Sequence, residues 1–293
     1  MSIPLERFGA DSTAEQVTEG LDLSGTTWLV TGVSSGLGLE TARVLALRGG
    51  HVVGAARTED KARAALEQLG IEGTPVACEL SEAASVRAAV SQIQALDRSL
   101  DGIIANAGIM ALPELRQRHG LELQLLTNHV GHFILVTGLL DRLSEAGRVV
   151  VLSSGAHHRA EGLELDNLSG ERDYQPWRMY GRSKLANILF ARSLAQRLSG
   201  GRTANAVHPG VIATNLARHV PDPEALFARM RPQMKTVEQG AATQCLVATH
   251  PGLASSSGLY FSDCQPTDPS DLAQDDALAA ELWARTEQLV AEL

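Results

Sequence analysis

Residues 27–39, which read TWLVTGVSSGLGL, constrain the fold more than any other part of this 293-residue chain. The first five are β-branched, aromatic or aliphatic, as expected of a strand buried on both faces. Gly32, Gly36 and Gly38 follow at once, and an apolar segment with helical spacing covers residues 37–48. A strand, a glycine-rich turn and a helix in this order predict a phosphate site, because glycines admit close backbone approach and a helix N-terminus offers free N–H groups. The alternative is a tight turn that binds nothing.

Strands and helices are predicted to alternate along the rest of the chain. The expected strands cover residues 27–31, 51–56, 74–78, 102–105, 148–153, 203–208 and 258–261. The expected helices cover residues 37–48, 59–69, 81–96, 121–143, 179–198, 236–249 and 275–293. This alternation predicts an α/β protein with a doubly wound Rossmann fold, in which a mostly parallel seven-stranded sheet carries helices on both faces.

No proline- or glycine-rich linker divides the chain, so we expect residues 1–293 to form a single nucleotide-binding domain. Residues 1–24 are expected to be an N-terminal lead-in. Residues 155–178 and 216–235 are irregular in pattern and are expected to be inserts on the substrate side, since loops of that length in a compact domain are usually functional.

Composition excludes several classes of function. The net charge of -9 argues against a nucleic-acid partner. Apolar residues 133–140 are too few to span a bilayer, so no membrane anchor is expected. The three cysteines are scattered, as is usual in a reducing compartment, and a cytoplasmic location is predicted. Neither His129 with His132 nor His157 with His158 has a carboxylate or cysteine at ligand spacing, so no metal site is predicted.

Tyr180 and Lys184 lie four residues apart on the helix expected over residues 179–198, so both side chains should lie on one face. A free tyrosine ionises at about 10, too high for a base at neutral pH. A neighbouring ammonium group favours the phenolate and lowers the tyrosine pKa. Tyr180 is therefore a candidate to donate a proton to a ketone or to take one from an alcohol. The alternative is an ordinary amphipathic pair, with the tyrosine packed and the lysine solvated.

The end of the second strand indicates the choice of cofactor. An acidic residue there would bind the ribose hydroxyls of NAD, whereas an arginine suits the 2′-phosphate of NADP. The strand is expected to end at Ala56 and Arg57 follows it, with no acid before Glu59. The planar fork of an arginine pairs well with phosphate, so NADP(H) is predicted rather than NAD(H). The alternative is a solvated surface arginine.

Several short motifs occur in a fixed order along the chain. They are T-G-x-x-x-G-x-G at residues 31–38, Asn106-Ala107-Gly108, Asn128, Ser153-Ser154, Tyr180-x-x-x-Lys184, and Pro209-Gly210-Val211 with Thr214. In this order they resemble the classical short-chain dehydrogenase/reductase family over nearly the whole chain. Four segments resemble its retinol-dehydrogenase-like branch, namely NHVGHF at 128–133, SKLANILF at 183–190, HPGVIATNL at 208–216 and YFSDC at 260–264.

The resemblance implies roles for individual residues. The catalytic residues would be Asn128, Ser154, Tyr180 and Lys184, with Ser153 as the alternative to Ser154. Asn128 would kink its helix and hold a water linked to Lys184. The cofactor-binding residues would be Gly32, Ser34, Ser35, Gly36, Leu37, Gly38, Arg57, Glu79, Leu80, Asn106, Ala107, Gly108, Tyr180, Lys184, Pro209, Gly210, Val211 and Thr214. Glu79 departs from the aspartate usual in the family at that position, which puts a side-chain contact there in doubt.

The expected activity follows from these roles. The chain is predicted to be an NADP(H)-dependent oxidoreductase that interconverts a secondary or primary alcohol and a ketone or aldehyde, with Tyr180 as general acid/base. The two inserts would form a pocket for an apolar small molecule. The alternative is a non-catalytic NADP(H)-sensing binding protein with the same fold. Homodimers or homotetramers are usual in proteins of this family, so the resemblance makes either an expectation, with a monomer as the alternative.

Overall fold

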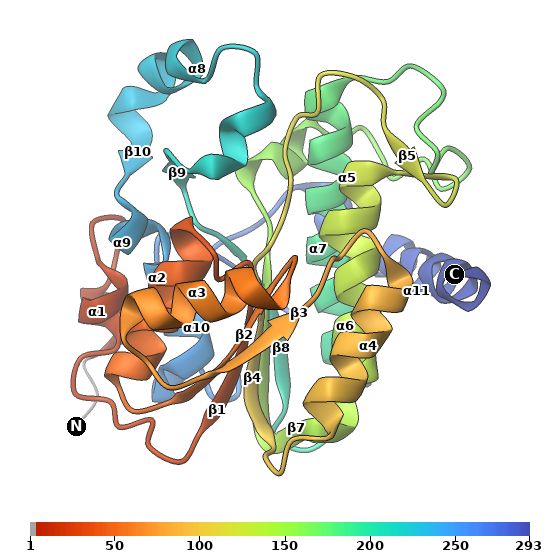
Figure 1. The fold of residues 1–293 in the computed structure, drawn as a ribbon. Coiled ribbons are helices and arrows are strands. Elements are labelled where there is room, and N and C mark those ends of the chain that lie inside the picture. The colour runs from red at the N-terminus through yellow and green to blue at the C-terminus, as the bar shows by residue number, and fades with distance from the viewer. Residues whose placement is uncertain (1–3) are drawn as a thin grey trace.

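A mostly parallel sheet of eight strands runs through the centre of the protein (Figure 1). The computed structural model describes residues 4–293. The strands lie in the order β12-β11-β8-β7-β4-β1-β2-β3. Their bounds are β1 Thr27–Thr31, β2 His51–Ala56, β3 Thr74–Ala77, β4 Leu100–Ala105, β7 Leu143–Leu152, β8 Thr203–His208, β11 Tyr260–Ser262 and β12 Gln265–Pro266. The predicted doubly wound α/β fold is confirmed.

Strand β1 lies where the strand order reverses. Val30 pairs with Gly54 of β2 on one side and with Ile104 of β4 on the other, and both pairings are parallel. From β1 the chain adds β2 and β3 on one side, and it then crosses back through α4 to add β4 on the other side of β1. In open α/β sheets, a crevice forms at the carboxyl ends of the strands at such a point. The glycine turn after β1 and the segment after β4 both face it.

The sheet has one strand more than the predicted seven. β11 turns back into β12, which is antiparallel to it, and Ser262 pairs with Gln265. The two residues between them, Asp263 and Cys264, have φ values of 52° and 61°. Tight hairpin turns need this left-handed conformation, and they are usually marked by asparagine or glycine. The Asp-Cys pair carries little of that signal, which is why the sequence does not reveal the eighth strand.

Helices cover both faces of the sheet, as Figure 1 shows. One face carries α2, α3 and α10, and the other carries α4, α6, α7 and α11. The helices are α1 Ala14–Val17, α2 Gly36–Leu47, α3 Glu59–Leu69, α4 Ala83–Gln94, α5 Leu123–Leu125, α6 Gly131–Gly138, α7 Pro176–Arg197, α8 Pro223–Met230, α9 Val237–Gly240, α10 Ala242–Thr249 and α11 Asp276–Glu292. The shorter 3-10 turns are η1 Leu5–Arg7, η3 Leu140–Arg142, η4 Gly155–Arg159, η5 Asn215–His219, η6 Arg231–Gln233, η7 Pro251–Leu253 and η8 Asp271–Gln274.

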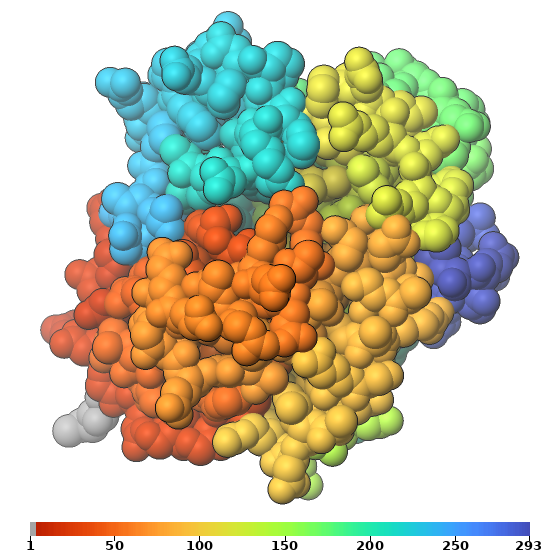
Figure 2. All heavy atoms as spheres, in the orientation of Figure 1, coloured from red at the N-terminus to blue at the C-terminus, as the bar shows by residue number. Residues whose placement is uncertain are grey.

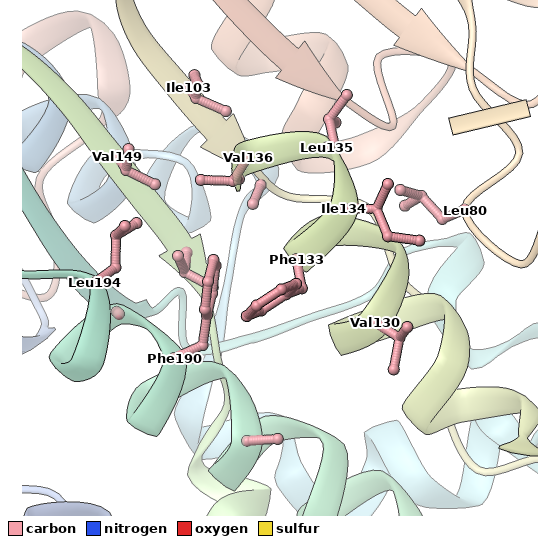
Figure 3. Packing of buried hydrophobic residues seen from close by; sticks show 14 of the residues in the cluster. Leu80, Ile103, Val130, Phe133, Ile134, Leu135, Val136, Val149, Phe190 and Leu194 are labelled. Atoms are coloured by element: carbon pink, nitrogen blue, oxygen red, sulfur yellow. The ribbon is translucent and has the colours of Figure 1, made fainter. Parts of the chain in front are cut away.

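The two faces bury separate hydrophobic clusters. Successive residues of a strand point to opposite faces, so Ile103 belongs to one cluster and Ile104 to the other. Phe133 of α6 and Phe190 of α7 meet in the cluster that contains Ile103, with ring centroids 5.4 Å apart (Figure 3). Trp283 of α11 packs against both rings. This aromatic contact holds α7 against its neighbours α6 and α11 and so helps to fix the helix that carries Tyr180.

The single helix predicted over residues 121–143 is wrong. That segment contains β6 Leu121–Glu122, α5, the π-helical turn η2 Leu126–Val130, α6 and η3. β7 begins at Leu143, five residues before the expected start, because Leu143 pairs with Leu100 across an irregularity in register. The segment from Leu121 to Leu139 contains no proline and its only glycines are Gly131 and Gly138, so the sequence offers no clear boundary signal within its first ten residues. The π turn lies at Asn128, where a kink is expected.

The two expected inserts differ in regularity. Segment 155–178 contains η4 and then a loop that leads into α7. Segment 216–235 contains α8 and ends in β10 Met234–Lys235, which pairs with β9 Val211–Ile212. Prolines made this segment look irregular, but Pro223 takes the first helical position, where its missing N–H is harmless. Asp222 caps α8 by accepting a hydrogen bond from the Ala225 N–H.

Candidate active site

A cavity of about 1630 Å³ lies at the carboxyl ends of the central strands. Its walls include the glycine turn, the segment after β4, the end of β7, and α7. The outer walls come from the segment around α8 and from the segment around the short strand β5 Gln117–Arg118 (Figure 2). In that view the cyan and the yellow segments stand on either side, above the red and orange N-terminal part. The cavity is thus placed where the strand order predicts a ligand.

The glycine turn after β1 has the backbone conformation that a phosphate site needs. Gly32 and Gly36 have φ values of 76° and 58°, which residues with a Cβ rarely adopt. A Cβ on Gly38 would lie 2.7 Å from the Gly32 carbonyl carbon and 2.6 Å from Asn106 Nδ2. α2 starts at Gly36, and the side chain of Ser35 does not cap it. The first backbone N–H groups of α2 therefore stay available beside the cavity.

Thr31, the last residue of β1, holds the segment after β4 in place. Its hydroxyl oxygen accepts hydrogen bonds from the N–H groups of Asn106 and Ala107, each 2.9 Å long. The Asn106 amide in turn donates to the Thr31 carbonyl at 2.7 Å. Asn106, Ala107 and Gly108 all line the cavity. These contacts join the β1 and β4 ends into one rigid floor.

Tyr180 and Lys184 lie one turn apart on α7, and both line the cavity although each is almost fully buried. The Lys184 Nζ is 5.7 Å from the centre of the Tyr180 ring. It donates a hydrogen bond of 3.0 Å to the Leu152 carbonyl at the end of β7. Burial lowers the pKa of Lys184 to about 8.

The expected direction of the Tyr180 pKa is wrong for the protein without ligands. Burial raises the pKa of Tyr180 to about 12, and the nearby Ser154 side chain offsets only part of that rise. The ammonium of Lys184 does not lie against the phenol oxygen but points to the Leu152 carbonyl. Tyr180 is therefore protonated at neutral pH, which is the form that donates a proton.

The two serines at the end of β7 have different surroundings. The Ser153 hydroxyl is buried and donates to the Lys184 carbonyl at 2.8 Å, which ties β7 to α7. Ser154 follows the strand, and its side chain lies beside the phenol of Tyr180. Both residues border the cavity. Of the two, Ser154 has the geometry to hold a substrate oxygen against Tyr180.

Asn128 lies in the π turn and binds backbone on the neighbouring segment. Its Oδ1 accepts from the Ile109 N–H at 2.8 Å, and its Nδ2 donates to the Ile109 carbonyl at 2.9 Å. The same Nδ2 lies 2.9 Å from the Ser183 hydroxyl, which donates to the Tyr180 carbonyl. Asn128 therefore connects the cavity floor to α7, directly behind Tyr180 and Lys184.

The remaining predicted cofactor residues surround the same cavity. Arg57 follows β2 and is exposed to it, with Lys61 one turn further along. The Glu79 carboxylate accepts hydrogen bonds from the N–H and hydroxyl of Ser81, so it stabilises the turn after β3. The other predicted residues that line the cavity are Ser34, Ser35, Leu37, Leu80, Pro209, Gly210, Val211 and Thr214.

Comparison with known protein families identifies the family to which this arrangement belongs. The family model described as short chain dehydrogenase matches residues 26–225. The chain belongs to the short-chain dehydrogenase family. A chloroplastic short-chain dehydrogenase, TIC 32 B of Brassica napus, is 41% identical over 98% of this chain and 95% of its own. Human retinol dehydrogenase 12 is 39% identical over 90% of this chain and 85% of its own.

Solved structures agree with this assignment. An uncharacterized protein from Mycobacterium paratuberculosis superposes with a TM-score of 0.78 at 34% identity, covering 94% of this chain and 97% of its own. A short chain dehydrogenase from Burkholderia cenocepacia J2315, in complex with NADP, has a TM-score of 0.65 at 26% identity, covering 82% of this chain and 97% of its own. This short-chain dehydrogenase is accordingly an oxidoreductase that acts on CH–OH groups with a nicotinamide nucleotide. Its cytoplasmic location and its assembly as a homodimer or homotetramer stay predictions.

Within residues 4–293, no helix combines the length and apolar character needed to cross a bilayer. The same part of the chain contains no cluster of three or more histidine, cysteine or acidic residues placed to hold a metal. The two histidine pairs have other partners. His129 lies 3.0 Å from the Thr286 hydroxyl, and His157 accepts from the Ser270 N–H. His158 is exposed on η4.

His132 supports this dehydrogenase site from behind the cavity wall, which the sequence does not indicate. Its Nδ1 lies 3.0 Å from the Asn128 carbonyl, which can only accept, so Nδ1 carries the proton. Its Nε2 must then accept from the Thr31 hydroxyl, 2.9 Å away. Burial lowers the pKa of His132 to about 4, which keeps this tautomer neutral. His132 thus couples the π turn to the cavity floor, a role that no local pattern in the sequence reveals.

The buried histidines predict that the fold weakens in mild acid. Burial lowers the pKa to about 3 for His129 and to about 4 for His132, His157 and His208. The unfolded chain takes up these protons near pH 6.5, so stability is full above 6.5 and falls as the pH drops towards 4, by up to about 1.4 kcal/mol per pH unit for each histidine. Urea unfolding at pH 7.5 and pH 5.5 measures this, and equal free energies of unfolding would contradict it.

Proposed function

We propose that this short-chain dehydrogenase interconverts a secondary or primary alcohol and a ketone or aldehyde with NADP(H), and that Tyr180 is its general acid/base. One observation carries the proposal. Tyr180, Ser154 and Lys184 border the same cavity as residues 32 and 34–37 of the glycine turn, whereas Gly38 does not line it. A group that binds a nucleotide and a group that can move a proton therefore meet in one place.

The residues present fit a dinucleotide cofactor. The left-handed glycines and the open N-terminus of α2 suit a pyrophosphate, and the rigid segment 106–108 provides a flat wall beside it. An added Cβ on Gly36 would lie 3.3 Å from Thr214 Cγ2, a close contact, and would also be strained by the positive φ there. The short chain dehydrogenase from Burkholderia cenocepacia was solved in complex with NADP, which supports a nucleotide cofactor of this kind.

The protein's own contribution to the reaction is the handling of a proton. NADP(H), when bound, supplies or accepts the hydride. Tyr180, protonated at neutral pH, donates its proton to the carbonyl oxygen as that oxygen gains negative charge. Ser154 holds the same oxygen by a hydrogen bond, and the nearby positive charge of Lys184 stabilises the phenolate that remains. Asn128 donates a hydrogen bond to Ser183 and so keeps the part of α7 between Tyr180 and Lys184 in position.

The charges around Arg57 favour NADP(H) over NAD(H). Arg57, Lys61 and Arg218 line the cavity, whereas Glu79, the acid nearest the end of β3, is already hydrogen-bonded to Ser81. Burial lowers the pKa of Arg218, and the positive charge of Arg57 nearby lowers it further, so the two guanidinium groups repel each other. A 2′-phosphate would relieve that repulsion, whereas a ribose hydroxyl would not.

Replacing Arg57 with glutamine is expected to raise KM for NADPH about tenfold or more and to leave KM for NADH nearly unchanged, because one charge-assisted contact to the 2′-phosphate is lost. Steady-state kinetics with both cofactors measure the ratio. Arg63→Gln is the matched control, since Arg63 is exposed on α3, the helix that follows Arg57, pairs with Glu59 and does not line the cavity. An equal loss for both cofactors would show that Arg57 does not distinguish them.

The proposal as a whole is tested by spectrophotometry. A panel of aromatic, steroid, retinoid and aliphatic ketones, aldehydes and alcohols is assayed with NADPH and with NADH in parallel. We expect turnover of several carbonyl compounds, faster with NADPH than with NADH. Binding of NADPH without any turnover would favour the non-catalytic sensor, and a clear preference for NADH would overturn the choice of cofactor.

A further inference from the structure

Arg159 lies on the substrate side of the cavity, one aromatic ring away from Tyr180. Its guanidinium carbon is 5.5 Å from the centre of the Trp177 ring. Trp177 in turn meets Tyr180 edge to face, with centroids 6.2 Å apart. All three residues line the cavity. A substrate whose carbonyl reaches Tyr180 therefore has Arg159 and Trp177 beside its far end.

The segment that carries Arg159 is firmly held. A Cβ on Gly181 would lie 2.6 Å from the Ala156 carbonyl oxygen and 3.3 Å from Arg159 Cβ, so η4 packs directly on α7. His157 anchors the same turn, because its Nδ1 bonds the Ser154 carbonyl and its Nε2 accepts from the Ser270 N–H. Arg159 is thus presented from a fixed backbone, as a selective binding group should be.

The charge of Arg159 is not neutralised within the described part of the chain. No carboxylate of residues 4–293 pairs with its guanidinium, whereas Arg118, at the same cavity, pairs with Glu82. The cavity wall is also strongly basic for a protein of net charge -9. Its lining includes one acidic residue, Glu79, against the basic residues Arg57, Lys61, Arg116, Arg118, Arg159, Lys184, Arg218 and Arg229.

The phosphates of the cofactor do not account for Arg159. The predicted pyrophosphate site is formed by the turn after β1, and the predicted 2′-phosphate site lies at the end of β2. Arg159 belongs to η4, after β7, and its contacts are with α7. Apolar side chains that include Leu112, Leu216, Leu226, Phe227 and Met230 form much of the wall on the substrate side. The site therefore combines an apolar body with a cation at its edge.

We propose that Arg159, held against Trp177, binds an anionic group of the substrate, a carboxylate or a phosphate, so that the substrates are apolar carbonyl compounds or alcohols that carry such a group. The proposal rests on the proposed function and names the substrate class of the same site. The anionic group takes no part in the bond changes. Hydride from NADPH still forms the C–H bond at the carbonyl carbon, and the proton from Tyr180 forms the O–H bond.

Matched aldehydes test this substrate class. The probes are 4-formylbenzoate, its uncharged methyl ester and 4-formylphenyl phosphate, each assayed with NADPH. The wild-type protein is expected to have a kcat/KM about tenfold higher for 4-formylbenzoate than for the ester. The difference should lie in a lower KM, because it comes from one partly solvated charge-assisted hydrogen bond. Arg159→Gln should abolish that preference and leave the ester's kcat/KM within about twofold. Arg159→Lys should keep part of it. A higher kcat/KM for the phosphate than for the carboxylate would identify phosphate as the better anion.

Two controls complete the test. Arg285→Gln removes a half-buried charge on α11, outside the cavity, and should leave the preference unchanged. The preference should shrink as salt is added, because partly exposed charges are screened. A wild-type protein that favours the ester, or an Arg159→Gln variant that keeps the full preference, would overturn the proposal.

A binding measurement separates this proposal from the proposed function. Calorimetry on the protein saturated with NADPH compares 4-(hydroxymethyl)benzoate with its methyl ester, which form complexes that cannot react. Even if no aldehyde is turned over, tighter binding of the acid that is lost in Arg159→Gln supports the anion site. Equal binding of acid and ester by the wild-type protein would overturn it, whatever the assays with aldehydes give.

Discussion

Tyr180→Phe is expected to lower kcat for carbonyl reduction about a thousandfold, because the substrate oxygen then has no positioned proton donor. The ring remains and keeps its edge-to-face contact with Trp177, so the fold and NADPH affinity should change little. Single-turnover oxidation of NADPH measures the chemical step, and quenching of tryptophan fluorescence measures binding. The two readouts together separate a lost proton donor from a lost cofactor site.

Tyr174→Phe is the matched control for this variant. The Tyr174 hydroxyl donates to the Leu112 carbonyl at 2.8 Å, outside the group formed by Tyr180, Ser154 and Lys184. Removing it should cost stability of about 1 kcal/mol and leave kcat within a few-fold. If Tyr180→Phe keeps wild-type turnover, another group donates the proton. Ser154 would then be the first to examine, because it lies beside the phenol.

Local spacing was enough to predict the parts of the site that lie on one element. Tyr180 and Lys184 share a face of α7 because helical geometry brings residues four apart together. The glycine turn could likewise be predicted, since Gly32 and Gly36 adopt conformations that few other residues tolerate. Both inferences need only the chain's own covalent geometry.

Features that depend on burial or on distant partners could not be predicted from spacing. The sign of the Tyr180 pKa depends on how deeply α7 is buried and on where Lys184 points, and the Leu152 carbonyl that attracts Lys184 is 32 residues away. His132 and Thr31 meet across 101 residues. In the sequence Arg159 has no feature that distinguishes it from a solvated loop arginine. Only the fold shows that Trp177 of α7 packs against its guanidinium. In each case the decisive partner is remote in sequence.

Gly38→Ala is expected to weaken NADPH binding about a hundredfold, as the loss of one or two charge-assisted contacts would. The new Cβ would lie 2.7 Å from the Gly32 carbonyl carbon and 2.6 Å from Asn106 Nδ2, well inside van der Waals contact. Relief requires the turn and α2 to move apart, which displaces the N–H groups that face the cavity. Fluorescence titration measures the affinity, and urea unfolding should show a loss of about 2–3 kcal/mol from overpacking.

The same substitution also tests whether the floor and the turn act as one unit. Asn106 holds Thr31 through its amide, so a displaced Asn106 loosens the β1 and β4 ends together. Gly162→Ala is the control, because an added Cβ there meets nothing within 4 Å and stability should stay within about 0.5 kcal/mol. If Gly38→Ala binds NADPH as tightly as the wild-type protein, the pyrophosphate does not rest on this turn. The close packing at Gly38 would then serve the fold alone.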